Sequence, residues 1–156
     1  MCSSDLKFAA DPIWQVRAYA ARAARLLNED AILARLARDP DPNVAALALH
    51  TPAEARRALA RGHYGLVLEA AKFLKDEPDR RVSVPALLAA LRRLSAQRRA
   101  TSRDPRMEIL DRLREAGDPR AVSLLRALLA DIDPAVAARA AEMLHALTGE
   151  TVEAKT

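Results

Sequence analysis

The chain has 156 residues, of which 51% are hydrophobic, 29% are charged and only 3% are aromatic, and its formal net charge is +4. Alanine and leucine dominate and there are only four glycines, a composition typical of helical proteins. The sequence has no alternating run of β-branched residues that would predict a strand, and no apolar stretch near the roughly 20 residues that cross a membrane. We therefore expect an all-α chain.

One helical pattern recurs along the chain, with apolar residues at i, i+4, i+7, i+8 and i+11, the spacing of a helix that packs on its neighbours. Copies start at Val16, Val44, Leu66 and Val136, so the steps between them are 28, 22 and 70 residues, the last being about two periods of 35. Their apolar residues are Val16, Ala20, Ala23, Ala24 and Leu27; Val44 and Ala48; Leu66, Ala70, Phe73 and Leu74; and Val136, Ala140, Met143, Leu144 and Leu147.

The long last step predicts one more helix pair between the third and fourth copies. Residues 85–97 and 105–116 have the required helical spacing. The sequence as a whole therefore predicts a right-handed α-solenoid of stacked antiparallel helix pairs, with about four to five repeats. The apolar residues of the additional pair are Leu87, Leu88, Leu91 and Leu94 in the first segment and Met107, Leu110 and Leu113 in the second.

Asp-Pro pairs predict where helices begin. Each places a carboxylate where it can accept from the free amides of a first turn, followed by a residue that has no amide to leave unpaired. Thr51 and Glu54 add a capping box, and we interpret all of these aspartates as structural rather than catalytic. The pairs are Asp11-Pro12, Asp41-Pro42, Asp104-Pro105, Asp118-Pro119 and Asp133-Pro134, and the expected helix ends are Gly62, Gly117 and Gly149.

Residues 117–149, GDPRAVSLLRALLADIDPAVAARAAEMLHALTG, resemble the HEAT repeat family in its short bacterial form, with units like GDPRAVxxLLxxLxDxDPxVxxxAAxxL. The resemblance implies a curved solenoid. The family often has an arginine directly after the motif valine, which can pair with aspartates of the adjoining repeat. Arg17 keeps this arginine, whereas Ala45 and Ala137 replace it. The resemblance therefore implies that packing and helix caps, more than a continuous charge ladder, hold neighbouring repeats.

A second, looser resemblance concerns residues 14–24, WQVRAYAARAA, and residues 101–115, TSRDPRMEILDRLRE. They are similar to HEAT segments that precede a cyclophilin-type peptidyl-prolyl isomerase domain in some bacterial proteins. The cyclophilin motifs themselves do not occur in this sequence. The resemblance implies an accessory or spacing module of such an isomerase, with no catalytic residue carried by this chain.

Both ends of the chain differ in character from the repeats. Met1 to Leu6 resembles the translation of a common sequencing-adapter end, so we expect Cys2 not to be natural and the first helix of the opening repeat to lie upstream. The expected division is an artefactual or disordered start at 1–10, a repeat domain at 11–149, and a tail or linker at 150–156, which makes the chain a fragment of a larger bacterial protein. The absence of a signal peptide then carries no information about compartment.

The sequence offers little chemistry. His50, His63 and His145 form neither a His-Glu-x-x-His motif nor a pair four residues apart, so no metal site is expected. Gly62 and Gly65 lack the lysine or third glycine that would complete a phosphate-binding loop. We expect no catalytic residues, no cofactor and no metal, and we interpret the chain as a protein that is not an enzyme.

Nucleic-acid binding is the alternative that the basic charge favours. Against it, no aromatic residue follows Phe73, whereas single-strand binding uses aromatic side chains for stacking. The simpler interpretation of the arginines between Arg92 and Arg106 is that they lie on a solvated helix end and loop. The candidate basic cluster is Arg92, Arg93, Arg98, Arg99 and Arg103, extended to Arg106.

A partner-binding surface is predicted by geometry, because solenoids tend to bind along the row formed by their second helices. Mixed charge at the exposed offsets i+3 and i+6 favours a protein or peptide partner over a polyanion, and an ordinary solvated surface is the alternative. The sequence therefore predicts a non-catalytic scaffold that binds protein. The candidate residues are Tyr19, Leu47, Glu69 and Arg139 in one row, and Arg22, His50, Lys72 and Glu142 in the other.

Overall fold

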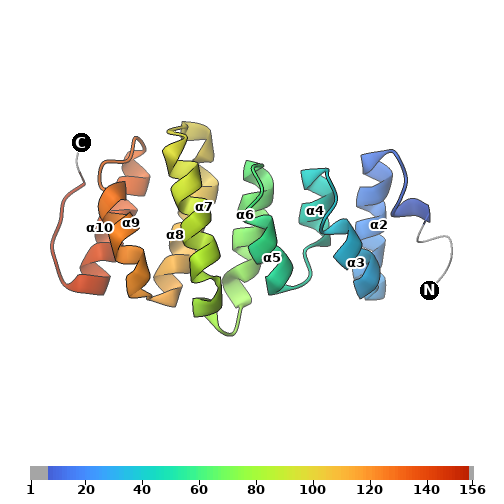
Figure 1. Cartoon of the computed structure of the whole chain (residues 1–156), viewed down its shortest axis with the longest axis horizontal. Helices are drawn as coiled ribbons and strands as arrows, with labels where there is room; N and C mark the ends of the chain where they lie inside the picture. The colour runs from blue at the N-terminus through green and yellow to red at the C-terminus, as the bar shows by residue number, and fades with distance from the viewer. Residues whose placement is uncertain (1–6, 155–156) are drawn as a thin grey trace. The chain divides into compact units, whose positions relative to one another are not determined.

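A computed structural model of the chain describes residues 7–154 (Figure 1). All regular secondary structure in this range is helical, which confirms the all-α prediction. The chain divides into two compact units, which we call unit 1 (Met1–Phe73) and unit 2 (Leu74–Thr156). The six residues that resemble an adapter translation lie outside the described residues. Ala9, in the expected disordered start, is only 3% exposed and belongs to the core of unit 1.

Within the residues that the structure describes, five helices of unit 1 pack in two layers. Helix α4 packs against both α2 and α6, while α3 packs on α2 and α4, and α5 packs on α6. In Figure 1, α2, α4 and α6 accordingly form one layer and α3 and α5 the other. The helices are α2 (Trp14–Leu27), α3 (Asp30–Leu36), α4 (Pro42–Ala48), α5 (Pro52–Ala58) and α6 (Tyr64–Phe73).

Unit 2 contains two helix pairs. α7 packs against α8, α9 packs against α10, and α8 and α10 contact each other. α7 and α8 occupy the two segments where an additional pair is predicted, so that prediction is confirmed. The elements are the 3-10 turns η1 (Leu74–Asp76), η2 (Arg80–Ser83), η3 (Ala100–Ser102) and η4 (Pro119–Ala121), and the helices α7 (Val84–Ala96), α8 (Arg103–Ala116), α9 (Val122–Leu128) and α10 (Pro134–Thr148).

The repeated apolar pattern marks the core correctly in three of its four copies. In α10, for example, Val136, Ala140 and Met143 are at most 1% exposed. The first copy departs from the prediction, because Ala23 is exposed and Leu27 is 63% exposed. The helices that pack on α2 in the described part of the chain are α3 and α4, and they leave these two side chains largely uncovered.

Most of the predicted helix starts are confirmed. Asp41 caps α4 by accepting from the Asn43 backbone N–H at 2.9 Å, and Asp133 caps α10 through the Ala135 N–H at 2.9 Å. Thr51 caps α5. Asp104 and Asp11 are exceptions. α8 begins at Arg103, because the preceding turn η3 leads directly into the helix, so Asp104 lies in its first turn. α2 begins only at Trp14, with Ile13 at its N-cap, and Asp11 accepts from the Ile13 N–H before the helix starts.

The predicted helix ends are confirmed at two of three glycines. Gly117 and Gly149 end α8 and α10 with φ of 58° and 76°, a left-handed backbone that favours glycine. Gly62 does not end α5, whose last residue is Ala58. Asn28, which the pattern did not single out, ends α2 in the same left-handed conformation with φ of 57°.

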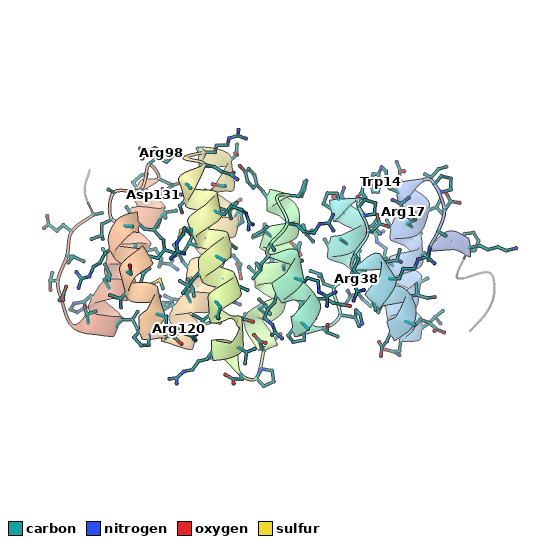
Figure 2. All side chains as sticks on the ribbon, viewed as in Figure 1. Trp14, Arg17, Arg38, Arg98, Arg120 and Asp131 are labelled. Carbon is teal, nitrogen blue, oxygen red and sulfur yellow. The ribbon has the colours of Figure 1, made fainter. Side chains whose placement is uncertain are left out.

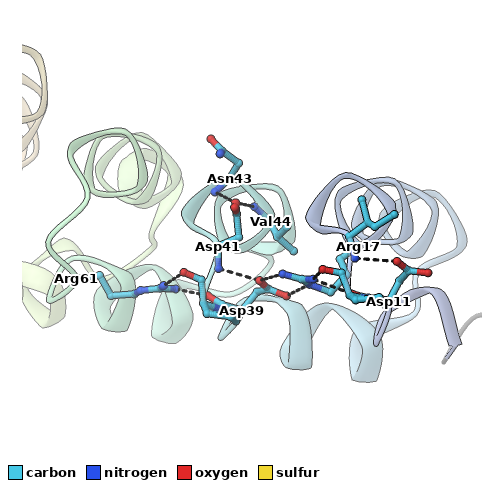
Figure 3. Close-up of polar contacts among 10 residues, drawn as sticks. Asp11, Arg17, Asp39, Asp41, Asn43, Val44 and Arg61 are labelled. Carbon is cyan, nitrogen blue, oxygen red and sulfur yellow. Dashed lines mark hydrogen bonds and ion pairs between the residues drawn. The ribbon is translucent and has the colours of Figure 1, made fainter.

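An arginine–aspartate clamp fixes the loop before α4. Arg17 Nε and Nη2 donate to the two carboxylate oxygens of Asp39 at 2.7 and 3.0 Å, and the Asp41 N–H donates to the same carboxylate at 2.9 Å (Figure 3). Burial raises the pKa of Asp39, but the hydrogen bond from Arg17 and the other donors outweigh it, so the pKa is lowered. The clamp ties α2 to the loop that starts α4.

Unit 2 has an equivalent clamp that the sequence analysis missed. Arg106 Nη1 donates to both carboxylate oxygens of Asp131 at 2.7 Å, and the Asp133 N–H donates to Asp131 at 2.9 Å. Both clamps thus use an Asp-x-Asp-Pro loop, in which the first aspartate binds an arginine and the second caps the helix. Arg106 does not follow a motif valine, so the family pattern could not point to it.

Asp118 should make stability depend on acid pH. Hydrogen bonds from the Arg120 side chain, and then from its backbone N–H, lower the pKa of Asp118 from 3.8 to about 2. Because Asp118 has a lower pKa in the folded protein than in the unfolded chain, its ionised carboxylate favours the folded state. This stabilisation is complete above about pH 4 and is lost as the pH falls toward about 2. The urea unfolding midpoints of the protein and of Asp118→Asn should differ at neutral pH, and they should converge as the pH is lowered toward about 2. A difference that persists at the acid end would contradict this assignment.

Candidate functional site

A groove crosses the α2, α4 and α6 side of unit 1 and has a volume of about 520 Å³. We call it the unit 1 groove. Helix α2 supplies one wall, α4 the other, and α6 contributes a single acidic side chain. Figure 2 shows Trp14 at the start of α2. The lining residues are Trp14, Gln15, Ala18, Tyr19 and Arg22 from α2, Asn43, Ala46 and Leu47 from α4, and Glu69 from α6.

Small side chains and two arginines set the shape of the unit 1 groove. Ala18 and Ala46 leave room between the two helices because neither side chain extends beyond Cβ. Arg25 Nη2 donates to the Leu47 and Leu49 carbonyl oxygens at 2.7 and 2.6 Å, which satisfies free carbonyls at the end of α4. With the Arg17 clamp before α4, arginines of α2 therefore bind both ends of that helix and fix the separation of the walls.

The two charged residues that line the groove differ in their partners. Glu69 is paired with Lys72 at 2.9 Å on the same helix. Arg22 lies over the ring of Tyr19, with 5.9 Å from its guanidinium carbon to the ring centroid, a cation–π arrangement that leaves its charge open to solvent. Tyr19 is itself 69% exposed. The groove therefore combines exposed aromatic and aliphatic side chains with the cation of Arg22. The acidic side chain that lines the groove, Glu69, is already paired with Lys72.

The structure brings four of the predicted partner-binding residues together, since Tyr19, Arg22, Leu47 and Glu69 all line the unit 1 groove. Lys72 lies beside it through its ion pair with Glu69. His50 is half-buried, and its Nδ1 lies 2.7 Å from the Glu54 carboxylate and 3.1 Å from the Ala48 carbonyl oxygen, so it does not belong to this surface.

The two remaining candidates, Arg139 and Glu142, lie on α10 of unit 2. They pair with each other at 3.4 Å, and Arg139 also pairs with Asp111 of α8. The contact with Asp111 gives Arg139 a role in packing α10 against α8, whereas Glu142 is exposed and pairs with Arg139 on its own helix. They form no part of the unit 1 groove.

Five groove residues escaped the sequence analysis: Trp14, Gln15, Ala18, Asn43 and Ala46. Gln15 and Asn43 occupy the same offset, one residue before the motif valine, in the first and second copies, and Trp14 lies one residue further back. Because the analysis considered only the offsets i+3 and i+6, it omitted the first turn of each helix. Ala18 and Ala46 share the offset i+2, so applying the offsets i−1 and i+2 to every copy would have found four of the five.

The basic cluster is smaller than the sequence indicates. Arg106 is fully buried in its pair with Asp131, so the expected extension of the cluster to Arg106 is wrong. Arg93 is half-buried, and Arg103 lies 3.6 Å from the Asp133 carboxylate. The side chains that remain well exposed and have no acidic neighbour in the described ion pairs are Arg92, Arg98 and Arg99.

Within residues 7–154, no cluster of three or more histidine, cysteine or acidic side chains is arranged to hold a metal ion. In the same range, none of the helices has the length and hydrophobicity needed to span a membrane. No family model matches the chain, and no curated protein or solved structure was found that matches it.

Proposed function

We propose that this chain is a non-catalytic scaffold of the HEAT type, a right-handed α-solenoid fragment of a larger bacterial protein, and that it binds an extended segment of a protein partner in the unit 1 groove. The observation that carries the proposal is the convergence of Trp14, Tyr19 and Leu47 with the open charge of Arg22 in one groove of about 520 Å³. Exposed aromatic residues and arginine are the side chains most enriched in the energetic centres of protein interfaces.

The groove supports a particular ligand chemistry. Aromatic-lined grooves suit extended segments, because an extended backbone presents side chains and carbonyls along a narrow channel. The side-chain amides of Gln15 and Asn43 can supply hydrogen bonds to such a backbone. Since Arg22 is the cation without an ion pair, the best ligand carries a carboxylate beside an apolar or proline residue.

Selection from a random-peptide phage library on the immobilised protein tests this proposal. We expect the selected peptides to be apolar with an acidic residue, and Arg22→Glu to weaken their binding at least about tenfold, as measured by fluorescence anisotropy. Leu47→Glu should have a similar effect because it places a charge on the apolar wall. Arg57→Glu is the matched control, since Arg57 is an exposed arginine on α5 outside the groove.

Two results would contradict the proposal in favour of the alternatives. Salt-sensitive binding of mixed-sequence single-stranded DNA that disappears when Arg92, Arg93, Arg98 and Arg99 become alanine would make the chain a nucleic-acid-binding module. Turnover of a prolyl peptide by the chain alone would overturn its non-catalytic role. An accessory module of a cyclophilin-type isomerase, by contrast, is expected to show no turnover by itself.

A further inference from the structure

Unit 1 has a second, smaller pocket, which is formed by the end of α3 and by α5, the layer that does not line the unit 1 groove. We call it the arginine pocket. Its volume is about 190 Å³, below the roughly 300 Å³ at which pockets for drug-sized ligands begin, so it suits one chemical group and not a whole cofactor. The lining residues are Ala37, Arg38, Glu54, Arg57, Ala58 and Arg61.

One of the three guanidinium groups is held in a fixed orientation. Arg61 Nη1 donates to the Asp39 carbonyl oxygen at 2.7 Å, and Arg61 Nη2 donates to the Pro40 carbonyl oxygen at 3.0 Å (Figure 3). Because these bonds already order the side chain, a ligand that contacts Arg61 loses little further conformational entropy. The pocket therefore has one preorganised wall.

The other two guanidinium groups have no anion to balance them. Arg38 (Figure 2) and Arg57 are exposed, and among the residues that the structure describes neither lies within ion-pair distance of a carboxylate. The acidic side chain of the pocket is engaged elsewhere, because Glu54 is only 7% exposed and its Oε2 lies 2.7 Å from His50 Nδ1. Two like charges therefore line one small pocket, and an anion placed there would be attracted to both.

The ends of the two helices do not require these two arginines. A cation in the last turn of a helix interacts favourably with its free carbonyl groups. Helix α3 already has Arg35 in its last turn, and α5 already has Arg56. Arg38 lies beyond the end of α3, and Arg57 is a second cation in the last turn of α5. Each helix end therefore has a cation besides the one that lines the arginine pocket.

We propose that the arginine pocket binds a single phosphate group, with Arg38 and Arg57 as the residues that contact it and Arg61 at its edge. A guanidinium presents its N–H donors as a planar fork that matches two oxygens of a phosphate group, and it stays charged at any physiological pH. A phosphate group suits the pocket better than a carboxylate, because its three acceptor oxygens can bind more than one fork. Both inorganic phosphate and a phosphorylated side chain of a partner offer this chemistry.

Titration of the ¹⁵N-labelled chain with sodium phosphate, at constant ionic strength and neutral pH, tests the proposal by nuclear magnetic resonance. The backbone amide signals of Ala37, Arg38, Arg57 and Ala58 should shift and reach saturation, whereas sodium chloride should not shift them in this way. Arg38→Gln and Arg57→Gln should each weaken phosphate binding at least about tenfold, because each removes charge-assisted hydrogen bonds. Both residues are exposed, so these variants should keep the circular dichroism spectrum of the unaltered protein.

Arg35→Gln is the matched control, because Arg35 is an exposed arginine of α3 that does not line the pocket, and its loss should change phosphate binding less than about twofold. Arg22→Glu in the unit 1 groove should also leave phosphate binding unchanged, so the two sites can fail separately.

A phosphoserine peptide tested beside its unphosphorylated form distinguishes the two sources of phosphate. Tighter binding of the phosphopeptide than of inorganic phosphate would support a phosphorylated partner, and equal binding would support the free ion. Amide shifts that stay linear up to the highest phosphate concentration would overturn the proposal. So would saturable binding that neither Arg38→Gln nor Arg57→Gln weakens.

Discussion

Asp131→Ala is expected to lower the free energy of unfolding by about 3–5 kcal/mol, the usual cost of leaving a buried charge unpaired. The guanidinium of Arg106 has a side-chain exposure of 0% and donates to both oxygens of Asp131, so removing the carboxylate leaves a buried positive charge without its anionic partner. The substitution also removes the acceptor of the Asp133 N–H, which orders the loop before α10. Urea unfolding followed by far-UV circular dichroism at neutral pH measures the effect.

Two further variants separate the buried charge from simple loss of contacts. Adding Arg106→Met to Asp131→Ala should recover part of the lost stability, because the methionine fills space without a charge. Asp104→Ala is the matched control: Asp104 is exposed in the first turn of α8, and its favourable interaction with the helix dipole is worth less than about 1 kcal/mol. A urea midpoint for Asp131→Ala equal to that of the unaltered protein would contradict the clamp.

Leu87→Ala should cost about 2–5 kcal/mol, while Leu88→Ala should cost clearly less. The two leucines are adjacent on α7 and have the same helix propensity, but Leu87 is 1% exposed whereas Leu88 is half-buried. Truncating Leu87 leaves a cavity between α7 and its neighbours that the packed helices cannot close. Chemical denaturation of both variants measures the difference, and equal losses would mean that the face of α7 is assigned wrongly.

The leucines of α7 also show the limit of pattern analysis. The sequence places Leu87, Leu88, Leu91 and Leu94 together on an apolar face, and all but Leu88 are buried. Adjacent residues differ by 100° around a helix, so only the position of the neighbouring helix decides which of two adjacent leucines it covers.

The unit 1 groove was predictable in part. Tyr19, Leu47 and Glu69 share one offset in their copies, and a repeat with constant geometry aligns equal offsets along one side. The prediction did not extend to Arg139 at the same offset in α10, because its guanidinium pairs with Asp111 and Glu142 in unit 2. An offset gives the direction of a side chain, but the charges around it decide its partner.

The sequence by itself determined the helices and most of their boundaries, because the signals are local: Asp41 and Asp133 bind amides two residues away, and Gly117 and Gly149 adopt a backbone that other residues avoid. Only the tertiary structure decided that Arg106 is buried and that Leu27 is exposed. Both depend on which helix packs on which face, and that is set by contacts between residues distant in the chain: Asp131 binds Arg106 from 25 positions away, while no described helix covers Leu27.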